Sequence, residues 1–156
     1  MTATKTVDPI ELLKDDHDKV KKLFDQFEQG KSASARTNAA RTAIMELQVH
    51  AEIEEKIFYP AFREKSDASD ADSVFREATE EHHVQHVLIG ELNKMQDDDP
   101  EFEAKFTVLA ENVRHHMEEE ESEMLPEAAK MDDDLLATLG SKMKEKKQDM
   151  MASMKG

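Results

Sequence analysis

Apolar residues recur at spacings of three and four along most of the chain, which places them on one face of an α-helix. The pattern predicts one helix from Pro9 to the residue before Gly30, and two more over about 35–64 and about 71–96. Pro100 opens a fourth. Four helices joined by short loops indicate an all-α fold, an antiparallel up-down-up-down four-helix bundle.

The end of the chain carries a weaker apolar pattern and many lysines and methionines. It predicts a short extra helix in which Leu135, Leu136 and Leu139 pack on the bundle while the terminus frays. We therefore expect two parts, a bundle over residues 1–130 and a C-terminal helical extension or tail over 131–156.

Polar residues interrupt the apolar stripe of every predicted bundle helix. They are His17 on the first helix, His50 and Glu54 on the second, His82 and His86 on the third, and His116 and Glu120 on the fourth. Burying an uncompensated polar or charged group costs several kcal/mol, and a domain has a net stability of only about 5–15 kcal/mol. So many buried groups need compensation, and metal ions would compensate all of them at once.

An internal repeat supports this interpretation. The segments His50–Pro60 and His116–Pro126 are identical at five of eleven positions, and each has a histidine and a glutamate four residues apart, on one helix face. His17 precedes the first segment by 33 residues and His82 precedes the second by 34, each directly after two acidic residues. The chain therefore reads as two helix pairs related by a repeat of roughly 65 residues.

Neighbouring residues leave two of these assignments open. Glu121 is the alternative to Glu120, and His83 is the alternative to His82. The apolar stripe favours His82, and it favours His116 over the adjacent His115.

Composition narrows the classes of function. The formal net charge of −15 disfavours a nucleic-acid partner, which requires a basic surface. Because the chain has no cysteine, disulfides, thiolate zinc sites and iron–sulfur clusters are excluded. Since no apolar run is typical of a signal peptide or a membrane span, we expect a cytoplasmic protein without a membrane partner.

The number of donors favours two metal ions. Five imidazoles and two carboxylates exceed the needs of one tetrahedral zinc, but they suit two octahedral ions if both carboxylates bridge. With a bridging oxo or hydroxo group, one coordination position stays open. Dioxygen or peroxide would bind at that position.

The order of a lone histidine, then HxxxE, HxxxH and HxxxE on successive helices resembles hemerythrin and its HHE cation-binding relatives, over about residues 8–130. The resemblance implies a four-helix bundle with a non-heme di-iron centre, which Glu54 and Glu120 bridge. It also implies that His17, His50 and His116 bind terminally and that His82 and His86 complete the histidine set.

The leading functional hypothesis is therefore a di-iron protein that binds dioxygen or a related small oxidant, with a reductase as a possible partner. The alternatives are a di-iron enzyme that decomposes hydrogen peroxide or oxidises ferrous iron, and a protein for metal storage or sensing. The same metal ligands serve all of them.

Overall fold

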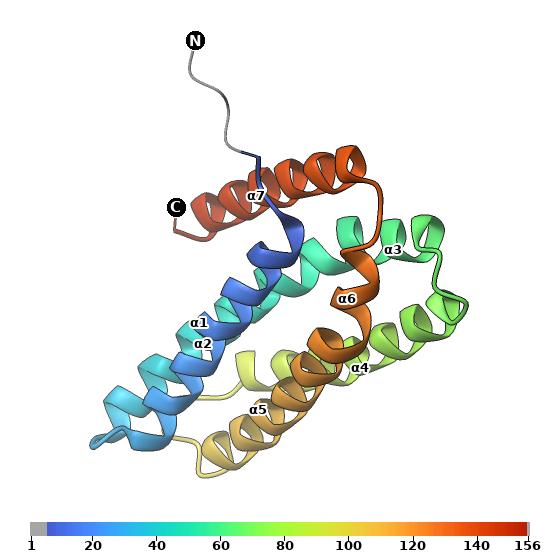
Figure 1. Cartoon of the computed structure of the whole chain (residues 1–156). Helices are drawn as coiled ribbons and strands as arrows, with labels where there is room; N and C mark the ends of the chain where they lie inside the picture. The colour runs from blue at the N-terminus through green and yellow to red at the C-terminus, as the bar shows by residue number, and fades with distance from the viewer. Residues whose placement is uncertain (1–5, 156) are drawn as a thin grey trace.

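Four antiparallel helices form a bundle, and a fifth long helix crosses its end (Figure 1). The computed structural model describes residues 6–155, so residues 1–5 and 156 of the two predicted parts lie outside it. The bundle helices are α1 (Pro9–Gln29), α2 (Ala33–Ile53), α4 (Ala71–Asn93) and α5 (Phe102–Glu119). The remaining elements are η1 (Glu54–Phe58), α3 (Tyr59–Lys65), η2 (Glu120–Met124), α6 (Leu125–Ala128) and α7 (Asp133–Lys155).

Side-chain caps set the starts of the first two helices. Asp8 accepts a hydrogen bond from the backbone N–H of Ile10 at 2.9 Å, and Pro9 follows where no amide hydrogen is needed. Ser32 accepts one from the N–H of Ala35 at 3.0 Å. The predicted bounds of the first helix are confirmed, and the predicted bundle is the observed fold.

Two π-helical segments, η1 and η2, occupy equivalent places in the repeat. Each begins at a glutamate of an HxxxE motif, and each is followed within two residues by a proline, Pro60 or Pro126. Proline has no N–H to continue an α-helical ladder and its ring crowds the preceding turn, so a wider turn accommodates it. In the first copy of the repeat, the wider turn before Pro60 is the π segment that starts at Glu54.

The core consists of two apolar clusters with a polar layer between them. One cluster includes Phe24, Phe27, Phe102 and Phe106 and fills the end of the bundle where α1 meets α2. The other fills the opposite end and adds residues of α3, α6 and α7. Each of the four bundle helices carries one buried histidine, which lies close to the point where the chain passes from one cluster to the other. The clusters thus fix a level at which four histidines face one another.

Helix α7 is longer than the short helix that the sequence predicts. It has 23 residues, as many as α4, because its lysines, alanines, leucines and methionines all favour helix. It lies against α1, α2 and η1, with Met143 fully buried and Leu139 nearly so, and the expected packing of its leucines is confirmed. Of the helices in residues 6–155, none is both long and apolar enough to span a lipid bilayer.

Candidate metal centre

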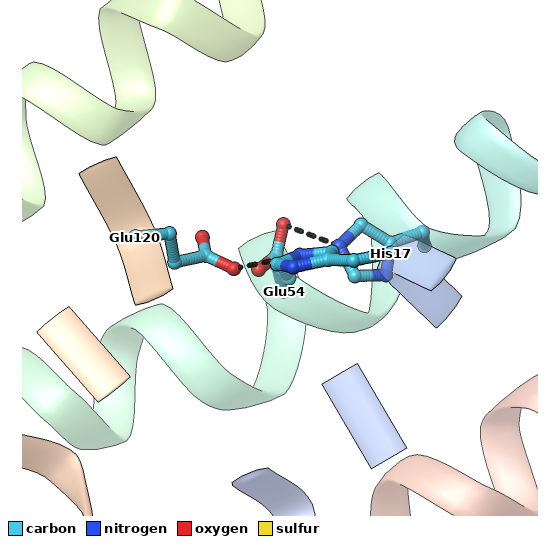
Figure 2. Close-up of side chains that lie close together, drawn as sticks. His17, Glu54 and Glu120 are labelled. Atoms are coloured by element: carbon cyan, nitrogen blue, oxygen red, sulfur yellow. Dashed lines mark ion pairs between the residues drawn. The ribbon is translucent and has the colours of Figure 1, made fainter. Parts of the chain in front are cut away.

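The first group of possible ligands contains residues of four elements. His17 of α1, His50 of α2, Glu54 of η1 and Glu120 of η2 each offer a nitrogen or oxygen atom within 4.8 Å of the others, and all four are buried. Nε2 of His17 lies 3.1 Å from Oε1 of Glu120, and Nε2 of His50 lies 3.1 Å from Oε1 of Glu54. Figure 2 shows His17, Glu54 and Glu120 pointing toward one another.

The second group uses the other half of the repeat. His82 of α4 and His116 of α5 join Glu54, again within 4.8 Å. Nε2 of His82 lies 3.2 Å from Oε1 of Glu54, and Nε2 of His116 lies 3.3 Å from Oε2 of Glu120. Glu120 therefore directs one oxygen at each histidine pair, whereas Oε1 of Glu54 lies between a histidine of each pair. Such carboxylates are placed to bridge two ions.

Unpartnered buried atoms show that the residues suit a metal. Among the described residues, five buried side-chain polar atoms have no hydrogen-bond partner, and four of them belong to this cluster. They are Nε2 of His17, Nε2 of His50, Oε2 of Glu54 and Oε1 of Glu120. Nε2 of His17 and Oε1 of Glu120 approach to 3.1 Å without forming a hydrogen bond, so both atoms are available to a metal ion.

Tyr59 contributes a phenol to the second group. Its Oη lies 2.6 Å from Oε2 of Glu120 and 3.2 Å from Oε1 of Glu54, and it also lies 3.1 Å and 3.0 Å from Nε2 of His82 and His116. Burial and the two nearby carboxylates keep the pKa of this phenol well above 10 in the metal-free protein. It therefore donates its hydrogen to Glu120, and it is positioned to offer oxygen to an ion there.

Four outer carboxylates orient the histidine rings. The Nδ1–H groups of His50 and His116 donate to Asp16 at 3.1 Å and Glu81 at 3.0 Å. Those of His17 and His82 donate to Glu121 at 2.6 Å and Glu55 at 2.8 Å. An ionised carboxylate only accepts, so Nδ1 carries the hydrogen and Nε2 is left for a metal.

The positions of the outer carboxylates in the sequence also match between the two copies of the repeat. Asp16 and Glu81 each directly precede a histidine of the cluster, and Glu55 and Glu121 each directly follow a glutamate of the cluster. Asp16 and Glu81 act within their own helix pair, whereas Glu55 and Glu121 reach across to the other pair. The centre thus has an approximate twofold pattern that extends beyond the ligand candidates.

These contacts shift the pKa values of the metal-free centre strongly. Burial opposes protonation of His116, but Glu120 and Glu81 outweigh it and raise its pKa to about 10. Burial also raises the pKa of Glu55, but the rings of His82 and His86 outweigh it and lower the pKa to about 2. Without a metal, His116 therefore forms imidazolium–carboxylate pairs with Glu120 and Glu81.

The structure brings six of the seven predicted residues together and leaves His86 outside. The His86 side chain is 46% exposed, and its Nε2 lies 2.7 Å from Oε2 of Glu55. Of the alternatives, Glu121 lies behind His17 rather than between the two groups, and His83 is exposed. His115 is also exposed. The oxygen atom of Tyr59 stands where the sequence predicts a fifth imidazole.

This arrangement separates the roles of His82 and His86. We expect His82→Ala to lose most of the metal of the second group, whereas His86→Ala retains near the wild-type content. The difference arises because the buried His82 contacts Glu54 and Tyr59, whereas the exposed His86 reaches no carboxylate of the centre other than Glu55. Elemental analysis of the purified variants measures it, with the exposed His83→Ala as a matched control. Equal metal loss in the His82 and His86 variants would contradict the placement.

The sequence analysis does not assign a role to Tyr59, although the repeat holds a signal that bears on it. Tyr59 aligns with Leu125, so the phenol has no polar counterpart in the other copy. The sequence analysis also does not assign the outer acids to the centre. Their matched positions in the two copies are the signal that could have identified them.

Comparison with known proteins agrees with this geometry. The model of the hemerythrin HHE cation binding domain matches residues 8–128. A crystal structure of a hemerythrin HHE cation binding domain-containing protein from Mycobacterium kansasii is similar, with a TM-score of 0.77 and 26% identity, over 94% of this chain and 89% of that one. A protein of Nostoc sp. (strain PCC 7120) described as a DNA nickase is 27% identical over 112 residues, which are 72% of this chain and 31% of that protein. The chain belongs to the hemerythrin HHE cation-binding domain family.

Proposed function

We propose that this chain is a non-heme di-iron protein that binds dioxygen or a related small oxidant at its buried centre. The observation that carries the proposal is that Glu54 and Glu120 each face both histidine pairs, with unpartnered atoms directed inward. His17 and His50 would hold one iron, and His82, His116 and Tyr59 the other. An oxo or hydroxo group would join the two ions.

The chemistry of the donor set supports iron. Imidazole, carboxylate and phenol are nitrogen and oxygen donors that suit a redox-active iron, and the thiolates that favour zinc or copper are missing from the sequence. When bound, a pair of irons supplies the electrons and the Lewis acidity that activate an oxidant. The protein contributes orientation through Asp16, Glu55, Glu81 and Glu121, and its two apolar clusters keep bulk water away.

The size of the access space supports a small ligand. A pocket of about 20 Å³ reaches His116 and Glu120 from the surface between α4 and α5. A water molecule needs about 10–15 Å³ measured in this way. The pocket thus admits species of the size of water, dioxygen or peroxide, and it is too small for an ordinary organic substrate.

Metal content and the visible spectrum test the proposal. Aerobic wild-type protein is expected to contain about two irons per chain and to absorb visible light, and Tyr59→Phe is expected to lose the part of that absorption that arises from a phenolate on ferric iron. Tyr59→Phe keeps the ring that packs in the core, so its unfolding temperature reports any damage to the fold. Zinc instead of iron, or less than one ion per chain, would overturn the proposal.

The same ligands could serve the decomposition of hydrogen peroxide, and Tyr59 favours including this second function. A buried phenol beside both bridging carboxylates can hold or release a proton at Oη. Added hydrogen peroxide distinguishes the two. Oxygen evolution over many turnovers favours the enzyme, and a coloured adduct that bleaches on deoxygenation favours the oxygen-binding protein.

The nickase activity named for the Nostoc protein is not part of the proposal. This chain spans about a third of that protein, so its activity can reside elsewhere in the longer chain. A net charge of −15 also opposes contact with the phosphate backbone of DNA. We therefore base the function on the metal centre alone.

A further inference from the structure

Helix α7 breaks the twofold pattern of the two helix pairs. By the repeat, the groove where α1 meets α2 and η1 corresponds to the groove where α4 meets α5 and η2. α7 covers the first groove: it packs on α1, α2 and η1 with Met143 fully buried (Figure 1). The second groove holds the pocket that reaches the metal centre. Only one of two equivalent routes inward is thus covered by the added helix.

Two carboxylates at equivalent places in the repeat, Asp16 and Glu81, differ in exposure and in their ion pairs. Asp16 and Glu81 each accept a hydrogen bond from Nδ1 of a cluster histidine. The Asp16 side chain is 6% exposed and forms an ion pair with Lys147 of α7. The Glu81 side chain is 27% exposed and lines the pocket, and within residues 6–155 it pairs with no lysine or arginine. On the covered side a lysine thus adds positive charge beside the carboxylate, and on the open side, among the described residues, the carboxylate pairs with histidine alone.

The open groove is acidic at its mouth and leads to ligand candidates at its floor. Glu77, Glu119 and Glu123 line it together with Glu81. His116 and Glu120 line it as well, and Glu120 is 2% exposed. Oε2 of Glu120 lies 3.3 Å from Nε2 of His116, and its unpartnered oxygen, Oε1, lies 3.1 Å from Nε2 of His17. The pocket thus leads from surface acids to a buried carboxylate that contacts both histidine pairs.

A second ligand set lies at this mouth. Glu81, His115 and Glu119 offer atoms within 4.8 Å of one another, and Nε2 of His115 lies 2.9 Å from Oε1 of Glu119. Glu81 also holds the ring of His116, and Glu119 is the chain neighbour of Glu120. An ion held by this set would therefore touch residues that are directly linked to the buried ligand candidates.

We propose that the groove between α4 and α5 is the access route for ferrous iron, and that Glu81, His115 and Glu119 form an outer cation site on that route. This inference rests on the proposed di-iron function. Nitrogen and oxygen donors suit Fe²⁺, and acidic residues at a low-dielectric opening raise the local cation concentration and the rate of association. Coverage of the equivalent groove by α7 directs uptake to this side.

The test compares rates of iron uptake by the full-length, metal-free chain. His115→Ala/Glu119→Gln removes two outer-site residues and leaves Glu81 and the buried cluster intact. His83→Ala/Glu111→Gln is the matched control, because it also removes one exposed imidazole and one exposed carboxylate from α4 and α5 outside the groove. A rapid-mixing assay under anaerobic conditions follows free Fe²⁺ with a chromogenic chelator.

Uptake by the outer-site variant is expected to be about three- to tenfold slower than that of wild type, with the same final iron content. The control variant is expected to match wild type. If the outer-site variant took up iron at the same rate as the control variant, the proposed access route would be wrong. Failure of the proposed function would look different, because the wild-type protein would then not reach two irons per chain at any time.

Discussion

Glu54→Gln is expected to reduce the iron content from about two ions per chain to well below one. One carboxylate oxygen of Glu54 lies 3.1 Å from His50 and 3.2 Å from His82, so this residue serves both histidine pairs. Glutamine keeps the size of the side chain but removes its charge, and two cations would then share one fewer anion in a buried site. Elemental analysis of freshly purified protein measures the loss.

Two further variants show whether bridging is the cause. Glu52→Gln removes an acid from the surface of the same helix and is expected to keep both irons. His17→Ala removes a donor from the first group alone and is expected to leave about one iron. If Glu54→Gln retained two irons, or if it lost no more iron than His17→Ala, the shared carboxylate would not be a bridge.

The metal-free protein is expected to lose stability as the pH rises from 6.5 toward 10. The pKa of His116 is about 10 in the folded metal-free protein, against an ordinary value of 6.5. The contribution of its charged ring is therefore fully present below pH 6.5 and is lost as the pH passes through 10. The pKa of Glu55 is about 2, against an ordinary value of 4.5, so its contribution is present above pH 4.5 and is lost as the pH falls through 2. Both contributions are fully present at about pH 4.5–6.5, so the metal-free protein should be most stable in that range.

Thermal unfolding followed by circular dichroism measures this dependence. The unfolding temperature of the metal-free chain is expected to be at least about 5 °C lower at pH 9 than at pH 6. The iron-loaded chain is the control, because it has the same surface charges while its ring nitrogens hold metal instead of a second proton. A metal-free protein that becomes more stable from pH 6 to pH 9 would contradict the assignment of imidazolium–carboxylate pairs.

The bundle was predictable because its signals are local. Helical spacing of apolar residues, the cap before Pro9 and the prolines of the two HxxxE segments act within one or two turns of helix. The polar layer was predictable for a related reason. His17, His50, His82 and His116 each interrupt an apolar stripe, and a stripe reveals which side of a helix faces the core.

The features in which the structure differs from the sequence predictions depend on contacts between distant segments. His86 shares a helix face with His82, but Glu55 of η1 holds it at the surface and Tyr59 contributes its oxygen to the second group instead. Both effects come from a segment about 30 residues upstream, which helical spacing within α4 cannot reveal. The length of α7 likewise depends on docking, through buried Met143 and the pairing of Lys147 with Asp16.

The crossing of Glu55 to His82 and of Glu121 to His17 makes the two helix pairs interdependent. In the proposed centre, each ion position would take a carboxylate from the opposite pair, and each pair also orients one imidazole of its neighbour. Neither half of the molecule would therefore assemble a finished site by itself. A chain cut between α3 and α4 would lose both proposed sites together, and iron would be captured only after the halves had closed on each other.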